Sequence, residues 1–139
     1  MNSALYLALS TFFYIFLSFY VIKGRLQFKI SIGHGDNIHL LRRIRAQSNF
    51  IQYTVLFLLL LMTSENMGLA ALAVHFFGIV YLLGRAAHAY GLVKAEHLKN
   101  GKIQGLKFRS WGMYSTFFSL FCLALYLLFK YFSLLFFQS

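Results

Sequence analysis

The chain has 139 residues, of which 60% are hydrophobic and 19% are aromatic, while only 12% are charged. A soluble domain of this length has too small an interior to bury so much apolar surface, so the composition excludes that class and predicts a membrane protein. The formal net charge of +10 is carried by residues that lie between apolar blocks. That arrangement favours membrane lipid over nucleic acid as the partner.

Four apolar segments are each long enough to cross a bilayer as a helix, which takes about 20 residues. They cover about residues 3–22, 39–63, 67–93 and 110–136. Basic residues follow the first segment rather than precede it, which is unlike a signal peptide. The sequence has no proline, so none of the segments has to break at one. We therefore predict an all-α, integral membrane four-helix bundle that forms a single domain over residues 1–139.

Basic residues are distributed unevenly over the three connections between these segments. They flank the first connection (Lys23, Arg25, Lys29, Arg42, Arg43 and Arg45) and the third (Lys94, Lys99, Lys102, Lys107 and Arg109). The second connection, at residues 63–66, has no Lys or Arg. Because cytoplasmic connections carry an excess of positive charge, the first and third are expected in the cytoplasm, with both termini on the opposite side.

The first connection contains the stretch GHGDN at residues 33–37, which is typical of a turn. His34 and His39 could suggest a metal site, but Asp36 is the only acidic residue nearby, so we predict a solvated loop and no metal. Cys122 is the only cysteine and lies in an apolar run. We interpret it as a small buried hydrophobic residue.

Polar residues interrupt the second and third segments with the spacing of a helix face. In the second segment, Arg45, Asn49 and Gln52 are four and three positions apart and form one stripe. Tyr53 lies beside this stripe. In the third segment the same spacing relates Tyr81, Arg85 and His88. Both stripes lie at the expected cytoplasmic end of their helices. The two stripes are therefore expected to share a pocket.

Neither stripe contains an acidic residue that could pair with Arg45 or Arg85. A buried cation needs a partner, so the pattern predicts an anionic ligand that enters from the cytoplasm. The alternative is that the arginines reach lipid phosphates while the amides only join helices. The matched depth and spacing of the two stripes favour the pocket. Gly78, Gly84 and Gly91 fit close helix packing.

These residues resemble the MAPEG family, the membrane-associated proteins of eicosanoid and glutathione metabolism. The stretch Arg45–Asn49 with Tyr53 is similar to the second-helix signature Arg-x-x-x-Asn-x-x-Glu, which is often followed by Tyr. The block GIVYLLGRAAHAYG at residues 78–91 resembles the third helix, and GRLQF at 24–28 resembles the basic end of the first. The resemblance covers nearly the whole chain, and small members from the bacterial inner membrane are the most similar.

The resemblance implies a homotrimer that binds glutathione, as a co-substrate, at subunit interfaces near the cytoplasmic side. The positions that match glutathione-binding residues are Arg25, Arg45, Gln47, Asn49, Gln52, Tyr53, Arg85 and His88. Glutathione carries two carboxylates, which suits unpaired arginines. It also brings its own thiol, in keeping with a chain whose only cysteine lies in the last segment.

The chemistry that the resemblance implies is thiolate attack on a lipophilic electrophile, by a glutathione transferase or peroxidase. A nearby cation lowers the pKa of a thiol and so favours the reactive thiolate. The family uses an Arg at the start of the fourth helix, in some members beside a Ser, and Arg109 with Ser110 fits that place. Lys99 is the alternative cation if the third connection aligns without gaps. We favour Arg109, which directly precedes the fourth segment and remains charged under all conditions.

Two positions depart from the family pattern. Gln52 stands where the family has Glu, so the charge that would attract the ammonium of the ligand is missing, and Leu92 stands where some members have Tyr. The alternative function is a non-catalytic membrane scaffold or lipid-binding protein with the same fold. A solute transporter is a third possibility, which the scarcity of intramembrane acidic residues disfavours.

Overall fold

The computed structural model describes residues 1–95, 97–99 and 102–137, with side chains at residues 1–94 and 105–136. It contains the long helices α1 (Ser3–Phe28), α2 (Ile38–Asn66), α3 (Ala71–Tyr90) and α4 (Leu106–Phe137). A short π-helix, Gly91–Ala95, continues α3, and the strands β1 (His97–Lys99) and β2 (Lys102–Gln104) pair as an antiparallel hairpin before α4. The four predicted helices are confirmed, and each is long and apolar enough to cross a membrane.

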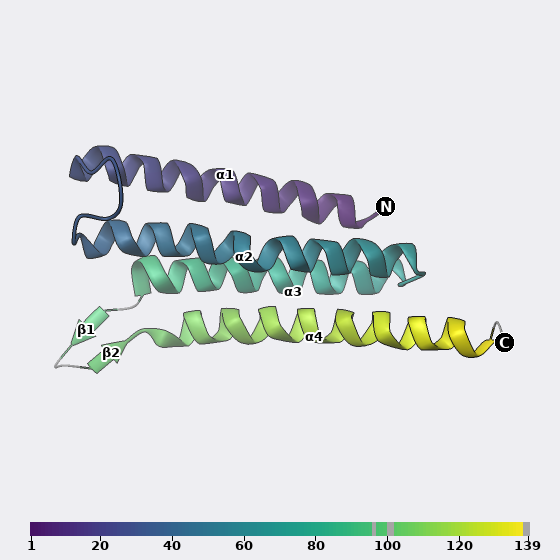
Figure 1. Cartoon of the computed structure of the whole chain (residues 1–139). Helices are drawn as coiled ribbons and strands as arrows, with labels where there is room; N and C mark the ends of the chain where they lie inside the picture. The colour runs from purple at the N-terminus through teal and green to yellow at the C-terminus, as the bar shows by residue number, and fades with distance from the viewer. Residues whose placement is uncertain (96, 100–101, 138–139) are drawn as a thin grey trace.

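The helices lie side by side, as Figure 1 shows, with both termini at the same end of the bundle as the α2–α3 turn. The α1–α2 loop and the β1–β2 hairpin are both at the opposite end. The basic connections therefore share one end of the molecule. We call this the basic end, and the other the terminal end.

The structure differs from the predicted segments mainly at the helix ends. Helix α1 continues to Phe28, six residues beyond the predicted end of the first segment at residue 22. Helix α3 begins at Ala71 rather than near residue 67, because Gly68 takes a left-handed φ of +92° and ends the turn after α2. Helix α4 begins four residues earlier than predicted, directly after Gly105 at φ +81°. The third connection contains the β1–β2 hairpin, which the sequence analysis did not predict.

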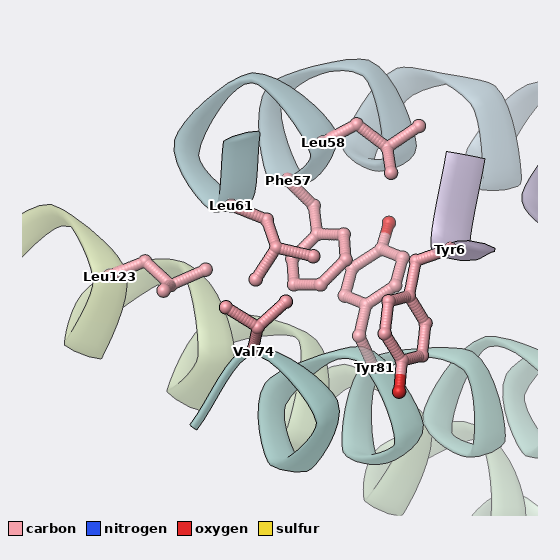
Figure 2. Close-up of a cluster of buried hydrophobic side chains, with 7 residues drawn as sticks. All are labelled: Tyr6, Phe57, Leu58, Leu61, Val74, Tyr81 and Leu123. Atoms are coloured by element: carbon pink, nitrogen blue, oxygen red, sulfur yellow. The ribbon is translucent and has the colours of Figure 1, made fainter. Parts of the chain in front are cut away.

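The main hydrophobic core joins all four helices near the terminal end. Figure 2 shows its members, which are Tyr6, Phe57, Leu58, Leu61, Val74, Tyr81 and Leu123. The rings of Phe57 and Tyr81 stack with their centroids 3.7 Å apart. A second cluster, made of Leu17, Ala46, Phe50 and Ala89, lies nearer the basic end. Large apolar side chains such as Phe12, Phe121 and Phe129 are exposed on the outer faces, as expected of a surface that faces lipid.

Small residues bring α3 and α4 into close contact. A Cβ atom on Gly84 would overlap the Oγ atom of Ser115, and one on Gly91 would lie 2.7 Å from the backbone nitrogen of Arg109. A Cβ on Gly112 of α4 would lie 2.6 Å from the Cβ of His88. Close approach of this kind is typical of helix pairs in membranes. The contact at Gly91 fixes the start of α4 against the end of α3.

Polar contacts hold the ends of α1 and α2 together. At the terminal end, the carboxylate of Glu65 accepts hydrogen bonds from the backbone nitrogens of Asn2 and Ser3 and from both of their side chains. It thereby satisfies N–H groups that a helix start leaves without partners. At the basic end, the guanidinium of Arg43 lies 4.3 Å from the centroid of the Tyr20 ring and donates to the Gln27 side chain. Asn37 caps α2 by accepting from the backbone nitrogen of Leu40.

Candidate functional site

A polar pocket of about 660 Å³ opens at the basic end, between the start of α2, the end of α3 with the π-helix, and the start of α4. This volume falls within the range of about 300–1,000 Å³ that is usual for small-molecule sites. The side chains that line it are Ile38, Leu41, Arg42, Arg45, Ser48, Asn49, Gln52, Tyr53, His88, Leu92, Arg109 and Met113.

Helix α2 forms one wall of the pocket through residues three and four positions apart. Arg45, Asn49 and Gln52 lie on this wall with Tyr53 beside them, so the structure brings together the stripe predicted from the sequence. Arg45 and Gln52 are exposed, whereas Asn49 and Tyr53 are half-buried. Together with Arg42, which also lines the pocket, the wall therefore presents two cations and two amides.

The opposite wall comes from α3, the π-helix and α4. His88 lies near the end of α3 with only 3% of its surface exposed, and its Nδ1 atom is buried without a hydrogen-bond partner among the described residues. Arg109 lies in the first turn of α4 and is exposed. The N-terminal end of a helix carries a partial positive charge, which adds to the charge of the guanidinium. This part of the pocket is therefore suited to an anionic group.

Arg85, which the sequence predicts as a pocket residue, lies beneath the α2 wall rather than at the pocket surface. It is 1% exposed and donates to the side-chain oxygens of Asn49 and Thr116. Its guanidinium also lies 5.5 Å from the centroid of the Tyr53 ring. Its Nε atom is buried without a hydrogen-bond partner among the described residues. Arg85 is thus a buried cation that supports Asn49 and Tyr53 from behind.

Among the described residues that line the pocket there are three arginines and no acidic residue. The sequence contains three acids, Asp36, Glu65 and Glu96. Glu65 binds the start of α1 at the terminal end of the bundle, and Asp36 lies in the α1–α2 loop. Glu96 lies outside the described residues. Within the described lining, the charge of the pocket is positive, and the chemistry that it offers is binding of an anion.

Several predicted site residues lie outside this pocket. Gln47 donates to the Ser18 hydroxyl of α1 at 2.7 Å, and Arg25 donates to the backbone oxygens of Ser31 and Gly33 in the loop after α1. Lys99 lies in β1, and its side chain is outside the described part of the chain. A single chain therefore does not bring Gln47 or Arg25 to the pocket.

Ser110 lines a smaller hollow that adjoins the pocket along α4. This hollow of about 470 Å³ shares Arg109 and Met113 with the polar pocket and continues to Tyr114 and Phe117. Tyr114 and Phe117 are largely exposed on the outer face of α4. Arg109 therefore lies between a polar pocket and an apolar surface that faces lipid.

A third hollow is an apolar groove of about 280 Å³ between α1 and α3. Its lining consists of Phe13, Phe16, Leu17, Tyr20, Ala86, Ala89, Tyr90, Val93 and, at one end, Lys94. The small side chains of Ala86 and Ala89 leave the space opposite the α1 aromatics. The groove is a place for an apolar chain rather than for a polar ligand.

The sequence analysis missed the contributions of Ser48, Met113 and Thr116. Ser48 is one position from the predicted stripe. On α4, Arg109, Met113 and Thr116 are four and three positions apart, which is the spacing that marked the other two helices. This spacing places Arg109 and Thr116 on one face of an apolar segment, and it was the signal that could have identified Thr116 as a partner of Arg85.

Comparisons with known proteins agree with this architecture. The model of the MAPEG family matches residues 3–129. Inner membrane protein YecN of Escherichia coli (strain K12) is 36% identical over 91 residues, which cover 66% of this chain and 70% of that protein. Inner membrane protein YecN of Escherichia coli O6:H1 matches with the same identity and coverage.

Proposed function

Because the chain belongs to the MAPEG family, we propose that its polar pocket binds glutathione and presents the thiol to a lipophilic electrophile. The observation that carries this proposal is the convergence of Arg45, Asn49, Gln52, Tyr53, His88 and Arg109 on one pocket. These are six of the residues that match glutathione-binding or catalytic positions in the family. The proposed activity is that of a membrane glutathione transferase or peroxidase.

The chemistry of the pocket fits this ligand. Glutathione has two carboxylates, and the pocket offers several cations and no acid among its described lining residues. Guanidinium groups bind carboxylates with paired, charge-assisted hydrogen bonds. The volume of about 660 Å³ suits a small peptide. Glutathione supplies a thiol that, once ionised, forms a sulfur–carbon bond with an electrophile while the leaving group departs with the bonding electrons.

Within this proposal the protein has to bind glutathione, stabilise its thiolate and hold the lipophilic substrate, and different side chains carry out each of these tasks. Arg45 and Asn49 bind carboxylate groups from the α2 wall. Arg109 stabilises the thiolate, aided by the positive end of α4. The proton of the thiol leaves to water through the open mouth of the pocket. The hollow beside Arg109, with its exposed Tyr114 and Phe117, is the proposed place of the lipophilic substrate.

We further propose that the protein is a homotrimer in which each site lies between two subunits. In a single chain, Gln47 and Arg25 lie on surfaces away from the pocket. Both match family positions that line the ligand, so a neighbouring subunit would have to supply them. Crosslinking or native mass spectrometry in mild detergent tests this assembly.

The proposed location is the bacterial inner membrane, with the basic end in the cytoplasm and both termini on the other side. The uneven distribution of Lys and Arg supports the orientation, and the basic connections share one end of the bundle (Figure 1). The name of the YecN relatives, inner membrane protein, supports the choice of membrane. Under this orientation the pocket opens to the compartment that holds soluble anionic metabolites.

The second candidate function is lipid binding without catalysis, and the apolar groove between α1 and α3 favours it. Lys94 at the end of this groove is exposed and could contact a lipid phosphate. Under this alternative the polar pocket would bind lipid headgroups, and glutathione would not compete for it.

Calorimetric titration of the purified protein with glutathione, in detergent, tests the primary proposal. We expect binding at micromolar to millimolar concentration, and we expect Arg45→Ala to weaken it about tenfold, because a charge-assisted hydrogen bond is lost. Lys23→Ala is the control, since it removes an exposed positive charge that does not line the pocket. Absence of binding at millimolar glutathione would overturn the proposal and leave lipid binding as the better reading.

A further inference from the structure

The contact between Arg85 and Asn49 determines which way the Asn49 amide faces. The guanidinium of Arg85 donates to the Oδ1 atom of Asn49. A guanidinium has five N–H donors and no acceptor, so the amide oxygen, and not the amide nitrogen, must be the atom that faces Arg85. The orientation of an asparagine side chain is often ambiguous. Here the donor-only neighbour removes the ambiguity.

Arg85 is held firmly enough to impose this orientation. It is 1% exposed, donates also to the Thr116 hydroxyl at 3.3 Å, and lies behind the Tyr53 ring. Asn49 lies between this buried cation and the pocket, and it lines the pocket surface. With its oxygen held inward, its Nδ2 group is the part of the amide that remains for a ligand.

We infer that Arg85 is a positioning residue that turns Asn49 into a hydrogen-bond donor for a negatively charged oxygen of the ligand. The inference rests on the proposed function for the identity of the ligand. If the ligand is glutathione, the acceptor of the Asn49 hydrogen bond is one of its carboxylates. The α2 wall then presents donors from both Arg45 and Asn49. The wall selects the anionic ends of a ligand and offers no charged acceptor for an ammonium group.

The substitution Asn49→Asp tests the donor directly, because the two side chains have almost the same shape. The new carboxylate keeps an acceptor for Arg85, so the fold is retained, but it has no N–H to offer to the pocket. We expect Tm to stay the same or rise while glutathione affinity falls at least tenfold. Glutathione affinity equal to that of the unmodified protein would overturn the inference, since Asn49 would then serve only to satisfy Arg85.

Asn49→Ala is the matched control for charge. It removes the N–H donor from the pocket, which Asn49 lines, without adding a negative charge. If Asn49→Asp acted only by repelling the ligand, Asn49→Ala would bind glutathione as tightly as the unmodified protein, and that result would overturn the inference. We expect Asn49→Ala to weaken glutathione binding as well.

A double-mutant cycle tests the part played by Arg85. Arg85→Lys retains a charge but loses the planar group that holds the amide. We expect it to weaken glutathione binding about tenfold in the unmodified background and less than about twofold in an Asn49→Ala background. Equal losses in both backgrounds would show that Arg85 does not act through Asn49 and would overturn its positioning role.

Titration with inorganic phosphate distinguishes a failure of this inference from a failure of the proposed function. If the unmodified protein does not bind glutathione, the proposed function is wrong, and phosphate titrations of the same variants decide the donor role. Phosphate binding that is lost in Asn49→Asp supports the inference. Equal phosphate binding by both proteins, or no binding of either anion, overturns it.

Discussion

Gly84 of α3 and Ser115 of α4 touch so closely that a Cβ atom on the glycine would overlap the serine Oγ. The Ser115 hydroxyl donates to the backbone oxygen of Gly112 at 3.0 Å, so it has a fixed place and cannot move aside freely. Gly84 directly precedes Arg85 and lies one turn before His88 on α3. The spacing between α3 and α4, and hence the position of Arg109 in the pocket, depends on the contact of Gly84 with Ser115.

Replacement of Gly84 by leucine is expected to force the two helices apart. Overpacking of a close contact costs about 1–3 kcal/mol, and we expect the free energy of unfolding to fall by that amount, measured by thermal unfolding in detergent. Ala86→Leu is the matched control, because Ala86 is exposed on the same helix. Equal stability of the two variants would contradict the close packing of α3 against α4.

Replacement of Arg109 by alanine is expected to lower turnover more than binding. Removal of the cation raises the pKa of the bound thiol, so less thiolate is present at a given pH. We expect kcat with a model electrophile to fall about 10²-fold and the midpoint of the pH–rate profile to move to higher pH. Arg109→Lys should recover part of the rate. An unchanged pH–rate profile in Arg109→Ala would exclude a role for Arg109 in stabilising the thiolate. Lys99 would then be the candidate cation.

Replacement of Gln52 by glutamate is expected to strengthen glutathione binding about 3–10-fold, because a carboxylate in the pocket would attract the ammonium of the ligand. Calorimetry with glutathione and with N-acetylglutathione, which lacks the ammonium, provides the measurement. The gain should appear with glutathione alone. A similar change with both ligands would mean that residue 52 does not contact the ammonium.

Replacement of Glu65 by glutamine is expected to loosen the start of α1. The amide retains one acceptor oxygen, but the charge that strengthens the hydrogen bonds from Asn2 and Ser3 is lost. We expect Tm to fall by about 2–5 °C, together with faster proteolysis near the N-terminus. Asp36→Asn serves as the control, since it removes a negative charge from an exposed loop. A Tm unaffected by Glu65→Gln would mean that this contact contributes little.

The helices and half of the pocket could be predicted because hydrophobic length and helical spacing are local properties of a sequence. Arg45, Asn49 and Gln52 share a face whatever surrounds them, and the structure places that face on the pocket. The spacing of residues along one helix does not predict which other helix its polar face will contact. Gln47 is adjacent in sequence to the stripe but faces Ser18 of α1.

The depth of a side chain could not be predicted either. Arg85 has the spacing of a pocket residue but is buried behind Asn49, because α4 supplies Thr116 as a second acceptor there. The start of α4 and the hairpin before it depend on backbone turns such as that at Gly105, which a glycine permits but does not require. These features follow from tertiary contacts and not from the periodicity of one segment.

The polar pocket takes its walls from both helical hairpins of the chain, since α2 belongs to the first and α3 and α4 to the second. It exists only while the two hairpins are docked, so any molecule that fills it opposes their separation. A ligand present at 100 times its dissociation constant adds about 2.7 kcal/mol to the stability of the state that binds it. The supply of ligand in the cell would then also set how long each copy of the protein survives in the membrane.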